Sequence, residues 1–114
     1  MEIMAYANVP TADLIIMTRN YADLLYMLSE KNRALNALTK CAELAKNVDQ
    51  SEYAALLYDA AVINANLKNT SETVRLFNLS FKAYAKMGAY EELQEKQAKA
   101  AYLLSSMKFT VPQN

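Results

Sequence analysis

The side chains that could carry catalysis or bind a metal ion are few in this sequence. It contains no histidine, so it lacks the commonest general base, the usual partner of a serine or cysteine nucleophile, and the imidazole metal ligand. Glu91 and Glu95 form a spaced carboxylate pair, but lysines stand near them at the spacing that is typical of a solvated helix face. The single glycine excludes a glycine-rich phosphate loop. We therefore predict no enzyme activity, no catalytic residue, no metal site and no cofactor.

Cys41 is the one cysteine in the chain, so it has no partner for an internal disulfide. Small and apolar residues surround it at helical spacing: Ala37, Leu38, Ala42 and Ala45. A free cysteine in such a setting is typically buried. We interpret Cys41 as a small core residue, with a reactive thiol as the alternative.

The chain carries 12 basic and 12 acidic residues, and its sequence pI is near 6.2. A neutral protein lacks the long-range field that attracts phosphates or an anionic membrane. Arg75, Lys82 and Lys86 make a weak basic stripe, which we interpret as ordinary surface. The first residues lack the basic region of a signal peptide, and the apolar run from Leu14 to Met17 is too short to span a bilayer. We predict no nucleic-acid partner, no membrane partner and a cytoplasmic location.

Helices must position any site in this protein, because one glycine and two prolines are too few turn-forming residues for a fold of short strands. Apolar residues recur at helical spacing in five stretches. This pattern predicts an all-α domain over residues 11–107, between a lead segment, 1–10, and a tail, 108–114. Breaks between helices are expected at 29–32, near Asn47, at 68–71 and at Gly88.

Short signals predict where individual helices begin and end. Asp49 with Glu52, and Asn69 with Glu72, have the spacing of a capping box, in which two side chains satisfy the free backbone amides of a first turn. Gly88 is suited to end the fourth helix in a left-handed conformation. The helix between the two boxes is apolar on both sides, which indicates a central helix with neighbours on both flanks.

The chain aligns with itself at a shift of 39 residues without a gap. The shift places Ala22 on Ala61 and then near the end of the chain on Ala100, and it places apolar residues of 21–45 on those of 60–84. A small side chain that recurs at one period allows close approach of two helices within a hairpin. We predict a repeated helical hairpin; chance alignment of alanine-rich helices is the alternative.

The repeated hairpin resembles the tetratricopeptide repeat family across roughly residues 11–107, with repeats at 11–49 and 50–88 and a capping helix at 89–107. The positions that match the family pattern are Thr18, Tyr21, Ala22, Leu25, Ala34, Leu38 and Cys41 in the first repeat, and Leu57, Ala60, Ala61, Asn64, Thr73, Phe77 and Ser80 in the second. The period is longer than the usual 34 residues, and no proline closes either repeat. The resemblance implies a right-handed superhelix of antiparallel helices; a closed helical bundle is the alternative.

The resemblance also implies a concave groove lined by the first helix of each pair. The residues that it places there are Arg19, Asp23, Tyr26, Tyr58, Val62, Gln94, Gln97 and Ala101. This mixture of aromatic, apolar and amide groups suits a bound peptide or helix, so we expect a non-catalytic adaptor or scaffold for a protein or peptide. Tyr26 and Tyr58 have a second interpretation, since aromatic residues at helical spacing also fill cores.

The N-terminal helix has no polar side at Leu14, Ile15, Ile16 and Met17, whereas an end repeat usually needs a polar outer face. These four residues are a possible association surface, either for a second copy of the chain in a homo-oligomer or for another protein. The alternative function is therefore self-association, or assembly as a subunit of a larger complex. A peptide-responsive regulatory domain, as in bacterial pheromone receptors, is a further alternative that depends on fold analogy alone.

Overall fold

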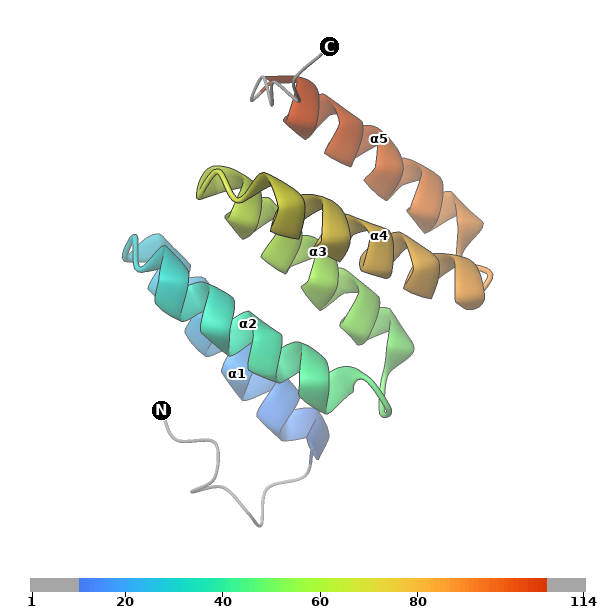
Figure 1. The fold of residues 1–114 in the computed structure, drawn as a ribbon. Helices are drawn as coiled ribbons and strands as arrows, with labels where there is room; N and C mark the ends of the chain where they lie inside the picture. Colours follow the sequence, from blue (N-terminus) through green and yellow to red (C-terminus); the bar gives the residue numbers. More distant parts are fainter. Residues whose placement is uncertain (1–10, 107–114) are drawn as a thin grey trace.

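The computed structural model describes residues 11–106, which form five α-helices (Figure 1). Their bounds are Thr11–Met27 for α1, Lys31–Ala45 for α2, Gln50–Asn66 for α3, Thr70–Lys86 for α4 and Tyr90–Ser106 for α5. No strand is present among these residues, and the predicted all-α class is confirmed. The lead segment and the tail predicted from the sequence lie outside the described residues.

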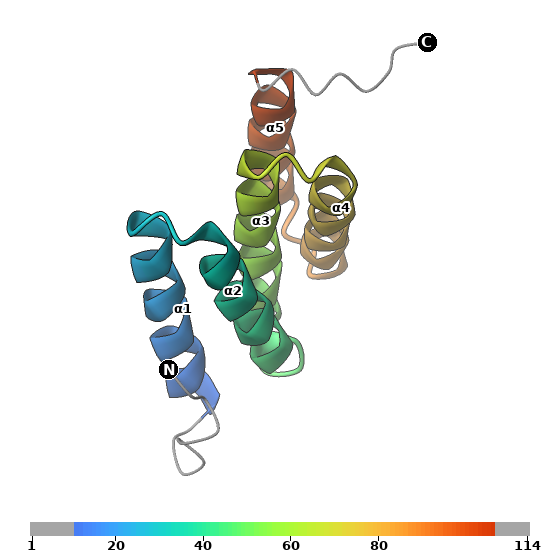
Figure 2. The same cartoon turned by 60° about the vertical axis from the view of Figure 1, so that its left-hand side comes forward.

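The helices form antiparallel hairpins that are stacked in chain order (Figures 1 and 2). Over residues 11–106, close packing joins α1 with α2, α2 with α3, α3 with α4 and α4 with α5. The fold is extended, with dimensions of 53 × 34 × 19 Å. These contacts describe an open stack, because a closed bundle would bring the first helix against the last ones. The right-handed superhelical twist stays a prediction.

The 39-residue period of the sequence is present in the structure. Both α3 and α4 begin 39 residues after α1 and α2. Matching side chains also make matching hydrogen bonds: the Cys41 thiol donates to the Ile15 carbonyl at 3.2 Å, and the Ser80 hydroxyl donates to the Ala54 carbonyl at 2.7 Å. The hairpins α1–α2 and α3–α4 are therefore two copies of one structural unit. Membership of the tetratricopeptide family is a separate matter and stays a prediction.

Three of the interhelical turns share one backbone conformation. Ser29, Lys68 and Gly88 all have positive φ, at 63°, 66° and 74°. The amide that follows each of them donates to a carbonyl of the preceding helix, as from Glu30 to Leu25 at 2.8 Å. This is the Schellman arrangement, which satisfies carbonyls at a helix end. The left-handed end predicted at Gly88 is confirmed.

Glycine is expected to stabilise the turn at Lys68, because a side chain in the left-handed region costs on the order of 1 kcal/mol. Lys68→Gly should raise the thermal midpoint by roughly 4–8 °C, measured by circular dichroism. Lys82→Gly, at an exposed position inside α4, is the matched control and should lower the midpoint. A lower midpoint for Lys68→Gly would contradict the assigned conformation.

The two predicted capping boxes have different outcomes. At α3, the Asp49 carboxylate accepts from the Glu52 amide at 3.1 Å, as expected, although the Glu52 carboxylate is bound by Arg19 and does not complete the box. At α4 the prediction is wrong, since the Asn69 side chain makes no cap hydrogen bond and donates to the Asn64 side-chain oxygen at 3.1 Å. Asn64 is buried, and a buried amide without a partner costs more than an unfilled cap at the surface.

The core follows α3, which is covered along both flanks as predicted. Leu56, Ala61 and Ala65 of this helix have no exposed surface. Cys41 is also fully buried, and burial raises the pKa of its thiol to about 11. The thiol is therefore protonated at neutral pH, and the interpretation of Cys41 as a core residue is confirmed.

The last helix, α5, presents mainly solvated side chains, and Ala100 is its buried apolar residue among those described. Glu95 and Lys99 form the expected pair at 3.8 Å. Lys96 does not pair with Glu92, because its ammonium lies over the Tyr58 ring of α3, 4.6 Å from the ring centroid. Lys96 thereby links the last helix to the middle of the stack.

Candidate functional site

A groove of about 520 Å³ lies between α1 and α3. Its lining comes from α1, from α3 and from one residue of α2: Ala22, Asp23, Tyr26, Met27, Leu38, Tyr58, Asp59, Val62 and Ile63. The two walls belong to equivalent helices, the first helix of each of two successive hairpins. The same repeat that builds the stack therefore also builds the groove.

Polar contacts join the two walls at both ends of the groove. Near the start of α1, Arg19 binds the Glu52 carboxylate and lies 3.5 Å from a carboxylate oxygen of Asp59. Near the end of α1, the Asn66 amide donates to the Tyr26 hydroxyl at 2.8 Å. These contacts fix the separation of α1 and α3, so the groove is formed before any ligand binds.

The groove wall includes apolar surface that the fold leaves accessible. Met27 is 79% exposed and Tyr26 is 39% exposed, while Val62 is half-buried between them and the core. Tyrosine and methionine suit recognition, because tyrosine offers a rigid amphipathic ring and methionine adapts to irregular partners. The structure thus places Tyr26 at the groove surface rather than in the core.

Tyr58 lines the same groove but is only 9% exposed. Its ring lies 5.3 Å from the Phe77 ring of α4, and the Lys96 ammonium covers it from α5. Burial also raises the pKa of its phenol, with smaller contributions from Asp59 and Glu95. Tyr58 is therefore primarily a core residue that closes one side of the groove.

Carboxylates stand on both walls. Asp23 is exposed on α1, and Asp59 is half-buried on α3. Burial raises the pKa of the Asp59 carboxyl, and the positive charges of Arg19 and Lys96 offset part of this shift. An aspartate therefore stands on each wall of this apolar groove, and neither lysine nor arginine lines it.

Arg19 was expected to line the groove. It is instead half-buried and neutralised by its contacts to Glu52 and Asp59. Its side chain lines a separate hollow of about 470 Å³ at the start of α1, together with Ile16 and Val48. Arg19 positions the walls of the groove and does not line it.

Three predicted groove residues, Gln94, Gln97 and Ala101, are exposed on α5 and do not line the groove between α1 and α3. Conversely, Met27 and Asp59 line it and were not among the predicted site residues. Asp59 had a signal in the sequence, since it is an acidic residue inside an otherwise apolar helix. Met27 had no such signal in the sequence beyond its place near the end of the first helix.

The association surface predicted on the first helix is only partly accessible. Leu14 and Ile15 are buried in the chain's own core, so the expectation that they form an outer surface is wrong. Ile16 is exposed and Met17 is half-buried. The exposed large apolar residues of α1 and of the turn after it are Ile16, Leu24, Tyr26, Met27 and Leu28.

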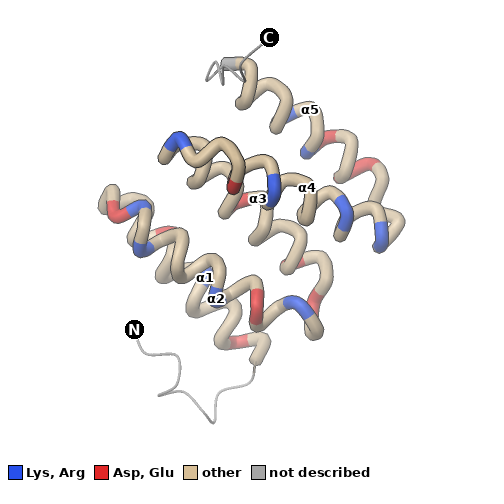
Figure 3. The backbone as a smooth tube through the Cα atoms, in the orientation of Figure 1, with Lys and Arg blue, Asp and Glu red and all other residues tan. Residues whose placement is uncertain are grey.

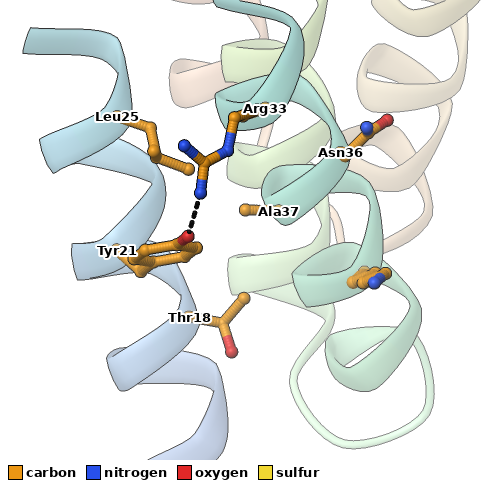
Figure 4. Close-up of a pocket in the computed structure, with 7 residues that line it drawn as sticks. Thr18, Tyr21, Leu25, Arg33, Asn36 and Ala37 are labelled. Atoms are coloured by element: carbon orange, nitrogen blue, oxygen red, sulfur yellow. Dashed lines mark hydrogen bonds between the residues drawn. The ribbon is translucent and has the colours of Figure 1, made fainter. Parts of the chain in front are cut away.

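A second hollow, of about 230 Å³, lies on the other side of α1, between it and α2 (Figure 4). Arg33 donates to the Tyr21 hydroxyl at 2.9 Å and to the Glu30 carboxylate at 3.1 Å, so its guanidinium is already engaged. Asn36 points away from α1 in this view. The polar groups of this hollow do not converge on one point, which disfavours it as a ligand site.

Charged residues of both signs are distributed over the helices (Figure 3). In residues 11–106 there is no group of three histidine, cysteine, aspartate or glutamate side chains with the geometry of a metal site. Within the same range, no helix combines the length and apolar character needed to cross a membrane. Among the hollows described above, the groove between α1 and α3 combines accessible apolar side chains with polar contacts that join its two walls.

Comparison with known proteins gives no assignment. No protein-family model matches the chain, and searches of curated proteins and of solved structures found no match to it.

Proposed function

We propose that the protein is a non-catalytic adaptor that binds a protein segment or peptide in the groove between α1 and α3. The observation that carries this proposal is the accessible apolar wall formed by Tyr26, Met27 and Val62, in a groove that the fold itself holds open. Two packed helices with such a wall suit a ligand that inserts apolar side chains between them. The resemblance to a family of peptide-binding repeats supports the same function.

The composition of the groove favours a macromolecular ligand over a small substrate. Tyr26 and Met27 expose apolar area, while the polar side chains Asp23 and Asp59 stand at the edges. An apolar centre with a polar rim is the usual composition of a protein-binding surface. The lining contains no serine, cysteine or histidine, so a Ser-His or Cys-His nucleophile is not assembled in the groove.

The test is a selection of peptides from a random displayed library on the intact chain, followed by affinity measurement on variants. Tyr26→Ala is expected to weaken binding of the selected peptides by about 30-fold, because a tyrosine that becomes buried when a partner binds can contribute roughly 2 kcal/mol. Tyr102→Ala is the matched control, since Tyr102 is 77% exposed on α5 and lies outside the groove.

Fluorescence anisotropy gives the two affinities, and circular dichroism checks that each variant is folded. Equal affinity of the Tyr26→Ala variant and the wild-type chain for every selected peptide would contradict the proposal. Failure to select any peptide that competes for one site would contradict it as well.

Self-association is the second candidate function, and the exposed apolar residues of α1 favour it. Leu24 is about half exposed, and Ile16, Met27 and Leu28 are more exposed still. Apolar residues grouped on one helix commonly mark a surface for a partner.

If these exposed apolar residues join two copies of the chain, light scattering should give twice the chain mass of 12.8 kDa at high protein concentration. Leu24→Lys should then return the protein to a monomer, because a lysine in an apolar contact must be desolvated. Lys40→Leu, at an exposed position on α2, is a control for general changes in surface charge and apolarity. A monomeric mass for the unmodified chain at all concentrations would exclude this candidate.

A further inference from the structure

We propose that the ligand of the groove between α1 and α3 is an amphipathic basic segment, in which lysine or arginine residues flank an apolar stripe. This inference rests on the proposed function and names the chemistry of the partner. It follows from the charges that line the groove, from those that surround it, and from their spacing relative to the apolar wall.

The lining carries negative charge on both walls and no positive charge. Asp23 belongs to α1 and Asp59 belongs to α3, and neither lysine nor arginine is among the residues that line the groove. Asp23 is exposed and forms no ion pair with the described residues. A bound cation therefore meets a carboxylate that no described side chain holds in an ion pair.

The immediate surroundings do not cancel this charge. Arg19 faces three carboxylates, those of Asp23, Glu52 and Asp59. Its closest contact is with Glu52, so it compensates Asp59 only in part. Lys96 is held over the Tyr58 ring and also acts on Asp59, while Glu95, which influences the phenol, is itself paired with Lys99. Acidic groups thus outnumber basic ones around the groove.

The acidic and apolar groups are arranged at a matching helical spacing on the two walls. Asp23 precedes Tyr26 by three residues, and Asp59 precedes Val62 by three residues. Residues three apart lie on the same face of a helix, about one turn from each other. Each wall therefore carries one carboxylate about one turn before an apolar side chain, and a ligand with a cation one turn from an apolar anchor matches both walls.

An acidic segment fits this groove poorly, because it would bring like charges together at a partly desolvated rim. A neutral apolar segment would fill the groove but leave Asp23 and Asp59 to lose part of their hydration without a partner. A basic segment avoids both costs, because its cations pair with the carboxylates of Asp23 and Asp59 while its apolar side chains fill the groove.

The test uses three fluorescent helical peptides with one common leucine stripe and with lysine, glutamine or glutamate at the flanking positions. Anisotropy titrations at low salt are expected to rank them lysine, glutamine, glutamate, with about a tenfold difference in Kd between the first and the last. Added salt should reduce this difference, since partly exposed charges are screened. Binding of the lysine peptide should weaken in the Tyr26→Ala variant.

Asp23→Lys should remove or reverse the ranking, and Asp23→Asn should reduce it. Glu43→Lys is the matched control, because it changes the net charge equally at an exposed position of α2 outside the groove, and it should preserve the ranking. A ranking with glutamate first, or one unchanged by Asp23→Lys, would overturn the inference. If Tyr26→Ala still weakens binding in that case, the proposed function stands and only the partner chemistry is wrong; if no peptide responds to Tyr26→Ala, both are wrong.

Discussion

Replacement of Phe77 by alanine should lower the free energy of unfolding by about 3–5 kcal/mol. Phe77 is 3% exposed, and its ring lies 5.3 Å from that of Tyr58 and 5.7 Å from that of Phe81, on which it stacks. The deleted ring leaves a cavity where α3 packs on α4. A domain of this size has a total stability of roughly 5–15 kcal/mol, so the variant should be at the edge of folding.

Urea denaturation followed by circular dichroism measures this change, from the midpoint and the slope of one cooperative transition. Val74→Ala on the same helix is the control, because Val74 is exposed and its truncation should change the stability by less than about 0.5 kcal/mol. A loss below about 1 kcal/mol for Phe77→Ala would show that the aromatic contact between the two hairpin helices is not part of the core.

Replacement of Ala61 by phenylalanine should destabilise the fold by about 3 kcal/mol through overpacking. Ala61 has no exposed surface, and the equivalent positions one period away, Ala22 and Ala100, are buried as well. A core at native packing density has no space for a ring at such a position, so either α3 must move from its neighbours or side chains must leave their preferred rotamers.

The control for this substitution is Ala98→Phe, at an exposed position of α5, which should leave the unfolding midpoint nearly unchanged. Thermal and urea unfolding of the two variants should therefore differ clearly. Wild-type stability for Ala61→Phe would mean that the recurring alanines do not mark close helix contacts, and the structural meaning of the 39-residue period would be lost.

Most of the fold could be predicted from the sequence, because the signals that define it are local and repeated. Helical spacing of apolar residues located the five helices, and Gly88 marked a left-handed helix end. The self-alignment identified equivalent positions such as Cys41 and Ser80, whose side chains make the same contact in the two hairpins. Burial on both flanks of α3 followed from its two apolar sides.

The errors concern how deep a residue lies and which polar partner it chooses. Leu14 and Ile15 were predicted to form an outer surface, but an apolar run alone does not say which of its members face the adjacent helix. Asn69 was predicted to cap α4, and its side chain binds the buried Asn64 instead. The burial of Leu14 and Ile15 depends on the adjacent helices. The contact of Asn69 is local, but it is favoured because Asn64 is buried, and that burial also depends on tertiary neighbours, which a single sequence does not contain.

The candidate site could be predicted in part. Asp23, Tyr26, Tyr58 and Val62 line one groove as expected, since they lie on the facing sides of the first and third helices. Arg19 does not line the groove, because Glu52 and Asp59 of α3 bind its guanidinium. Helical spacing predicts the direction in which a side chain points, whereas the position of a charged end group depends on which opposite charge it binds.

We predict that a peptide ligand binds in the groove between α1 and α3. The most direct measurement is a titration of the isotope-labelled chain with a selected peptide, followed by NMR shifts of the backbone amides. We predict that the largest shifts occur at Asp23, Tyr26 and Val62 and saturate with the same Kd as the anisotropy signal. Saturating shifts confined to α2, α4 or the exposed side of α5, with none at these three residues, would contradict it.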